Sequence, residues 1–264
     1  MDHVPIFAHA RRILLVTSAT ALLGGMFTPA ALAFDAIPPM QPIHQEITRA
    51  ALGGGTIMAE EALNRVVDAV RGSDLHLFDV NRHVDNAATP AGVCTRWKDG
   101  IDRWFAEAVT LAGQDRVAAL ERFGWVAHAI QDFYAHSNYV ELSLAGPVPP
   151  VEAILLGQCG PLPSAIQTGF FDLRYGVDGC PPLIGGPPRP PAPFGYCHAQ
   201  LNKDDPGRPN FAQARGFAVA ATKAAWEELH RRLVAAAGPG KAADGECLFL
   251  KLAWGETRSC SSAR

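Results

Sequence analysis

The chain has 264 residues, of which 48% are hydrophobic and 19% are charged, so it can bury a core of its own within one domain. Its formal net charge is −3, and the basic residues form no stripe along the sequence. Tight binding to duplex nucleic acid depends on many Lys and Arg contacts to phosphates. The composition therefore argues against duplex nucleic acid as a partner.

Residues 1–33 have the pattern of an export signal. Two arginines at positions 11 and 12 precede an apolar run, and residues 31–33 read Ala-Leu-Ala, a small-x-small cleavage site. The apolar run is shorter than the roughly 20 residues that a membrane-spanning helix needs. We expect cleavage after Ala33, export to the periplasm or the medium, and a single mature domain over residues 34–264.

Helices dominate the expected structure of the mature chain. The first covers residues 44–52 and ends at three glycines. Residues 59–71 and 95–112 carry apolar side chains at helical spacing, and residues 209–237 do so after a proline that suits a helix start. No alternation of apolar and polar residues persists long enough for a strand. The predicted fold class is all-α, a multi-helix bundle.

The loop between the second and third helices is rich in residues that bind metals. It contains Asp74, His76, Asp79, His83 and Asp85 within twelve residues. A polar loop with several aspartates is usually a solvated connection. Because two histidines lie among the three aspartates, the alternative is that this loop contributes to a metal-binding site.

A long predicted helix, residues 115–142, carries the pattern that organises the candidate site. His128, Asp132 and His136 lie at i, i+4 and i+8, so each is about 40° around the helix axis from the last. The two histidines are about 12 Å apart along the axis. A metal-binding face would thus hold more than one ion, with Asp132 between them. The intervening residues are mostly apolar, and buried polar groups need partners.

Gly124, in the same predicted helix, is expected to let a neighbouring element approach closely.

Residues 143–207 form a Pro- and Gly-rich segment that cannot be a long regular element. We interpret it as an ordered, disulfide-tied excursion over the site, with a short helix near residues 151–156. The six cysteines of the mature chain favour up to three disulfides in an exported protein. The pairs expected from their spacing are Cys180–Cys197, Cys247–Cys260 and Cys94–Cys159. Thiolate-bound zinc is not expected, because no CxxC spacing occurs.

The remaining histidines also lie near helix starts or in loops beside carboxylates, as a multinuclear site built from several helices requires. His230, between charged residues of the last helix, is assigned to the solvated face instead. Imidazole and carboxylate ligands without thiolate suit Zn²⁺, with Mn²⁺ or Fe²⁺ as alternatives.

The run WVAHAIQDFYAHSNYVEL, residues 125–142, resembles the signature of HET-C-like proteins. These belong with the zinc-dependent phospholipases C, which share a fold with the S1/P1 nucleases. The resemblance extends upstream to residues 44–48, 74 and 83–86, and downstream to residues 197–204. It implies an all-helical domain of the phospholipase C/P1 nuclease type that holds two to three zinc ions.

The same resemblance implies a set of ligands. Asp74, His83, His128 and Asp132 match the residues that hold one ion. The mature N-terminal residue, Phe34 here where the enzymes have Trp, would bind a second ion through backbone groups. It would do so together with His44, sharing Asp132.

For the third ion the chain departs from the pattern of the family. His136 follows Asp132 by only four residues, and His198 is followed four residues later by Asn202 in place of Glu. We carry over His136 and His198 as ligands, with Asp204 or Glu141 as substitutes for the missing carboxylate.

The function implied is an exported zinc-dependent phosphodiester hydrolase of phospholipase C type that acts on phospholipid head groups and touches the membrane surface peripherally. Asp74 or Asp85 would orient or deprotonate the attacking water, and Lys203 would lie near the phosphate. Aromatic residues of the excursion, among them Phe170 and Phe171, would wall the site. Two alternatives stay open: an S1/P1-type nuclease, and a non-catalytic lipid-binding module in which the metals are structural.

Overall fold

The computed structural model describes residues 42–54, 57–76, 78–150, 162–182 and 186–246. Phe34, the export signal and the predicted helix near residues 151–156 lie outside these ranges. The helices of the described part are α1 (Ile43–Leu52), α2 (Glu60–Ser73), α3 (Pro90–Arg96), η1 (Trp97–Asp102), α4 (Arg103–Leu111), α5 (Arg116–His136), α6 (Tyr139–Ala145), η2 (Leu173–Asp178), α8 (His198–Leu201) and α9 (Phe211–Glu246). The predicted all-α, multi-helix fold is confirmed. None of the helices in these ranges is long and apolar enough to span a membrane.

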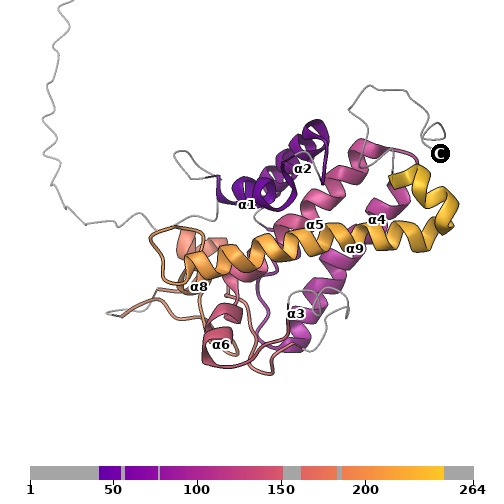
Figure 1. The fold of residues 1–264 in the computed structure, drawn as a ribbon. Coiled ribbons are helices and arrows are strands. Elements are labelled where there is room, and N and C mark those ends of the chain that lie inside the picture. The colour runs from indigo at the N-terminus through magenta and orange to yellow at the C-terminus, as the bar shows by residue number, and fades with distance from the viewer. Residues whose placement is uncertain (1–41, 55–56, 77, 151–161, 183–185, 247–264) are drawn as a thin grey trace, which may run out of the picture.

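Helix α5 is the centre of the bundle, with α1, α2, α4 and α9 packed against it (Figure 1). Asp115 caps its N-terminus by accepting a hydrogen bond from the amide of Ala118 at 3.0 Å. Every residue from 126 to 140 is buried. A helix buried on all sides places its polar side chains in the protein interior, and α5 carries the central part of the site.

Gly124 allows α2 to lie close against α5. A Cβ atom at this position would come within 2.5 Å of the Ala69 Cβ and 2.9 Å of the Val66 carbonyl oxygen. The expected close approach at Gly124 is confirmed. It brings the C-terminal end of α2, and Asp74 after it, next to the middle of α5.

The predicted helix over residues 115–142 ends early, at His136. Ser137 is extended, and the carbonyl of His136 accepts from Gly169 at 2.9 Å in place of a helical amide. Asn138 donates from its backbone to Gln167 and from its side chain to Ala165. The excursion thus supplies the hydrogen bonds that a continuous helix would have made within itself, and the chain restarts as α6.

The other helices differ from expectation mainly at their ends. The predicted helix over residues 95–112 begins at Pro90, after Thr89, whose hydroxyl accepts from Gly92. Its middle, η1, is a π-helical stretch. Helix α9 runs to Glu246, beyond the predicted end at residue 237.

The Pro-rich excursion is tied at its base by a disulfide between Cys180 and Cys197, with a Cα–Cα distance of 5.7 Å. This predicted pair is confirmed. Cys94 is also disulfide-bonded. The predicted partners Cys159, Cys247 and Cys260 lie outside the described residues, so those two pairings stay predictions. Directly after Cys197 the chain enters α8, which begins with the predicted ligand His198.

Candidate metal centre

Three side chains of α5 form the core of a buried cluster. His128 Nε2 lies 3.2 Å from Asp132 Oδ2, and His136 Nε2 lies 3.7 Å from Asp132 Oδ1. The three residues therefore share one face of the helix, as their spacing predicts. All of them are essentially inaccessible to solvent.

The two carboxylate oxygens of Asp132 face different histidines. Oδ2 lies 2.7 Å from His83 Nδ1, in addition to its contact with His128. Oδ1 lies 2.9 Å from His44 Nε2, on the same side as His136. One carboxylate thus stands between two pairs of imidazoles, and the rings of His44 and His128 lie 4.4 Å apart between their centroids.

His83 and Asp85 reach the cluster from the loop between α2 and α3. Val84 between them is buried and adopts φ of 51°, a left-handed conformation that is strained for a β-branched residue. Asn86 follows with φ of 60°, and its amide both donates to and accepts from the backbone of Phe171. The excursion therefore helps to fix the turn that points His83 and Asp85 inward.

Helices α1 and α2 each add one ligand-type residue. His44 is the second residue of α1 and is fully buried. Asp74 follows the last residue of α2, and its Oδ1 lies 3.6 Å from His128 Nε2. The close packing of α2 on α5 brings Asp74 to this position.

The C-terminal end of the excursion supplies the last two groups. Asp204 Oδ2 lies 2.8 Å from His136 Nε2. His198 begins α8, stacks on the His136 ring with centroids 3.9 Å apart, and has Nε2 3.6 Å from Asp85 Oδ2. Gly169 allows this approach, because a Cβ there would lie 2.5 Å from the Cα of His198.

Four buried carboxylates meet at this point: Asp74, Asp85, Asp132 and Asp204. Burial would raise the pKa of Asp132, but the imidazoles of His128 and His44 hold it well below its ordinary value. Burial raises the pKa of Asp85 well above its ordinary value, and the neighbouring carboxylates add to this effect. Concentrated negative charge away from water requires compensating cations. Two divalent ions would balance four carboxylates.

The histidines divide into two kinds. Burial lowers the pKa of His44 and of His83, but the nearby carboxylates, Asp132 first, together outweigh burial and raise both values to about 9. For His128 and His136 burial prevails, and the pKa of each is about 3. Without metal, these pKa values make His44 and His83 protonated and His128 and His136 neutral at pH 7.

The cluster contains three groups of side chains that could hold a metal ion: His44, Asp74 and His128; His83, His128 and Asp132; Asp132, His136 and Asp204. Two ligand atoms of one tetrahedral zinc ion lie ~3.3 Å apart, because each is about 2.0–2.1 Å from the metal. The distances around His128 Nε2 are 3.2, 3.3 and 3.6 Å, to Asp132, His83 and Asp74 respectively. These three distances therefore fit a metal ion, whereas the 2.7 Å between His83 Nδ1 and Asp132 Oδ2 is that of a hydrogen bond.

The sharing of atoms limits the number of ions. His128 belongs to two of the groups, and its Nε2 is the atom that faces Asp132, His83 and Asp74. One nitrogen binds only one ion, so this atom cannot serve both groups at once. Asp132 also belongs to two groups, and its two oxygens face different histidines.

Some buried polar atoms of the cluster residues have no hydrogen-bond partner. In the described part of the chain, His83 Nε2, Asp85 Oδ1 and His198 Nδ1 are buried and have none. Such atoms are rare in folded proteins and usually mark a site for water, an ion or chemistry.

The structure gathers seven of the eight predicted metal ligands, and Phe34 lies outside the described residues. Asp85, predicted as catalytic, lies with them. Of the two candidate substitutes, Asp204 and not Glu141 reaches His136, since Glu141 is exposed and pairs with Lys203 at 3.3 Å. His76 is exposed, and His230 is half-buried on α9 and belongs to none of the metal-type groups.

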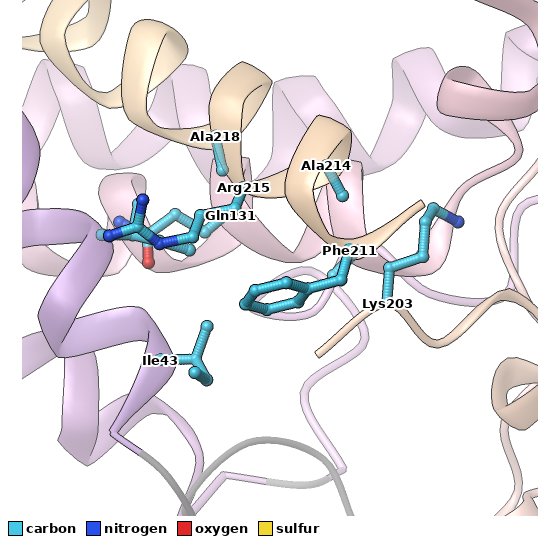
Figure 2. A pocket seen from close by; sticks show the side chains of 9 residues that line it. Ile43, Gln131, Lys203, Phe211, Ala214, Arg215 and Ala218 are labelled. Atoms are coloured by element: carbon cyan, nitrogen blue, oxygen red, sulfur yellow. The ribbon is translucent and has the colours of Figure 1, made fainter. Parts of the chain in front are cut away.

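The side chain of Lys203 has a structural role, because it is hydrogen-bonded to the backbone. Its ammonium is buried and donates to the carbonyls of Ser137 and Leu201 at 2.9 and 2.7 Å. Its side chain lines a hollow at the junction of α1, α5 and α9, where its amino end points away from Ile43 and Phe211 (Figure 2). Its predicted role beside a substrate phosphate therefore has no support from its contacts.

Sequence reasoning missed Gln131, whose side chain contacts His44 directly at 2.8 Å. The available signal was a polar amide in the apolar part of the central helix, three residues after His128. A buried amide must be hydrogen-bonded, and its position next to candidate ligands marks it as part of the site.

Comparisons with known proteins add no identification: no family model, no curated protein and no solved structure matches this chain. The function of the cluster is accordingly inferred from its own geometry and chemistry.

Proposed function

We propose that this protein is an exported phosphodiester hydrolase of phospholipase C type that uses two zinc ions. The observation that carries the proposal is Asp132, whose two oxygens face two different pairs of histidines. His83, His128 and Asp74 would hold one ion. His136 and Asp204, with His44, would hold the other. The role of His198 as a ligand of a third ion stays a prediction.

The choice of zinc rests on the ligand types. The three groups offer only imidazole nitrogens and carboxylate oxygens, without thiolates. This combination suits Zn²⁺ in hydrolytic sites, whereas Mg²⁺ and Ca²⁺ favour oxygen-only sets. Metal analysis would distinguish zinc from Mn²⁺ or Fe²⁺.

Zinc ions in such a site lower the pKa of water and offset negative charge on phosphoryl oxygens. The protein would supply the base. Asp74 belongs to one of the metal-type groups, whereas Asp85 belongs to none of them. The raised pKa of Asp85 suits a carboxylate that accepts a proton from water. Of the two predicted catalytic carboxylates, we assign this role to Asp85.

A phospholipid is the proposed substrate because apolar side chains border the cluster. The ring of Phe171 lies 5.2 Å from that of His198. Leu75 and Phe78, in the loop directly after Asp74, are 76% and 80% exposed. Exposed apolar side chains next to a hydrolytic site suit contact with a lipid surface. Resemblance of the central motif to HET-C-like proteins and phospholipases C supports the same choice.

The alternative with a specific observation in its favour is a non-catalytic module in which zinc joins the helices. His128 and His136 are completely buried, which is typical of structural metal sites with little room for substrate. The ligands come from α1, the end of α2, the loop between α2 and α3, α5 and the C-terminal end of the excursion, so the metal would connect distant parts of the chain.

The test begins with metal analysis of the purified mature protein, where two zinc equivalents are expected. Hydrolysis of phosphatidylcholine vesicles is then compared with that of single-stranded DNA. Asp85→Asn should keep the metal and lose about 10²- to 10⁴-fold in turnover. Asp79→Asn is the matched control, since Asp79 lies in the same loop and pairs with Arg82, away from the cluster.

Each result has a distinct meaning. Turnover of DNA alone would favour the nuclease, and full zinc occupancy without any turnover would favour the structural module. Absence of bound metal would overturn the proposal. N-terminal sequencing of the exported protein tests the expected start at Phe34, and the Cys180–Cys197 disulfide is consistent with an oxidising compartment.

A further inference from the structure

The side-chain amide of Gln131 joins three helices inside the protein. Its Oε1 lies 2.8 Å from His44 Nδ1 on α1. Its Nε2 lies 3.0 Å from Thr48 Oγ1, also on α1, and 3.1 Å from Thr222 Oγ1 on α9. Gln131, His44, Thr48 and Thr222 are all buried, so these hydrogen bonds do not compete with water.

The hydroxyl of Thr48 determines which way this amide faces. Thr48 Oγ1 donates its single proton to the carbonyl oxygen of His44 at 2.8 Å. Towards Gln131 the hydroxyl can therefore only accept a hydrogen bond. The amide must present its NH₂ group to Thr48, and its oxygen must face His44. The orientation of a side-chain amide is normally ambiguous, but here it follows from the single hydroxyl proton of Thr48, which is already donated to His44.

The orientation of Gln131 in turn determines the tautomer of His44. An amide oxygen only accepts, so His44 Nδ1 carries a proton and donates it. The lone pair of the neutral imidazole is then at Nε2, the nitrogen that lies 2.9 Å from Asp132 Oδ1. A ligand must present its lone pair to the metal, and this tautomer does so in the direction of the cluster.

We propose that Gln131 is a positioning residue that keeps His44 in the metal-binding tautomer, with Thr48 fixing the direction of the amide. This inference rests on the proposed metal centre and extends it to the residues behind one ligand. Hydrogen bonds to the second nitrogen of a metal-binding histidine typically change metal affinity by 10- to 100-fold when they are lost.

Two substitutions separate this role from simple packing. Gln131→Met keeps the approximate volume and removes the acceptor, so zinc affinity should fall by about 10- to 100-fold. Gln131→Glu keeps an acceptor for His44 Nδ1 and removes the donor to both threonines. It should therefore retain zinc affinity within a few-fold while losing thermal stability. Arg215→Met is the control, because Arg215 lines the same hollow as Gln131 (Figure 2) but lies outside the cluster.

Affinity is measured by competition with a chromophoric chelator on the full mature protein. Nitrogen-15 spectroscopy of zinc-loaded protein, labelled at histidine, gives a second measurement independent of activity. His44 should show a protonated Nδ1 in the wild type and in Gln131→Glu, with fast exchange of that proton in Gln131→Met.

Two outcomes would overturn the inference, and they can be told apart. If the wild type takes up no zinc, the metal centre and this inference both fail. If the wild type binds zinc and Gln131→Met binds it equally tightly, the metal centre stands and only the role of Gln131 fails. Equal losses of melting temperature in both variants, without any change in affinity, would assign the amide to helix packing.

Discussion

At the scale of single residues, Asp132 organises the site. Each of its oxygens faces a different pair of histidines, and its pKa is held low by the imidazoles of His128 and His44 despite burial. In the proposed two-zinc centre, a ligand shared in this way would make the two metal positions interdependent. Asp204 in contrast belongs to only one group.

Metal stoichiometry should therefore respond differently to two similar substitutions. Asp132→Asn removes a charge from both positions, and we expect the protein to retain no zinc after dialysis. Asp204→Asn affects only the position with His136, so one equivalent should remain. Elemental analysis measures both. Two equivalents in Asp132→Asn would contradict the bridging role.

The protonation of the histidines predicts a dependence of metal binding on pH. Without metal, Asp132 raises the pKa of His44 and His83 to about 9, so both are protonated at pH 7.5. A metal binds only the neutral imidazole, so it must displace these protons. His128 and His136, with pKa values of about 3, release none.

Zinc affinity should accordingly rise with pH up to about 9 and then level off. Close to two protons should be released per protein at pH 7.5. Calorimetry in two buffers of different ionisation enthalpy measures this number. Affinity that stays constant between pH 7 and 9 would show that His44 and His83 are already neutral.

At the scale of elements, the position of each ligand depends on how closely the helices approach α5. Helix α2 reaches α5 at Gly124, where an added Cβ would overlap Ala69 and the backbone of Val66. Gly216 on α9 is a helical glycine with open space around its Cα. The two positions form a matched pair for substitution.

Gly124→Ala should destabilise the protein by about 1–3 kcal/mol through overpacking. It should also weaken metal binding, because it displaces the end of α2 that carries Asp74. Gly216→Ala should stabilise the protein by up to about 1 kcal/mol, as alanine is the better helix former. Denaturant unfolding of both variants tests this contrast, and a stabilised Gly124→Ala would refute the close approach.

At the scale of the whole molecule, the cluster joins parts of the chain that are distant in sequence, from His44 to Asp204. Four carboxylates inside the bundle repel each other when no cation balances them. Metal binding to the folded state alone then adds to the free energy of unfolding.

Removal of metal by a chelator should lower the melting temperature. At a free zinc concentration 1,000 times the dissociation constant, the lost stabilisation is about 4 kcal/mol for a single site. Calorimetry with and without chelator, followed by addition of zinc, measures the loss and its recovery. An unchanged melting temperature would mean that the cluster holds no metal in the folded protein.

Local sequence patterns were sufficient for the fold class and for the face of α5 that carries His128, Asp132 and His136. Apolar spacing and helix caps depend on residues close together in the chain, and such patterns can be read directly. The positions of His44, Asp74 and His83 were anticipated from the resemblance of short motifs. Their assembly around Asp132 matches that expectation, and their role as ligands stays a prediction.

Only the tertiary structure decided where α5 ends and which groups complete the site. The excursion takes over the hydrogen bonds of the His136 carbonyl and the Asn138 amide, so a helix that the sequence pattern favours stops at His136. Asp204, and not Glu141, reaches His136 because the chain returns from the disulfide at Cys197. The orientation of Gln131 depends on hydroxyls of two other helices. Such contacts join residues tens of positions apart, and the path of the chain between them is fixed by packing that no local pattern encodes.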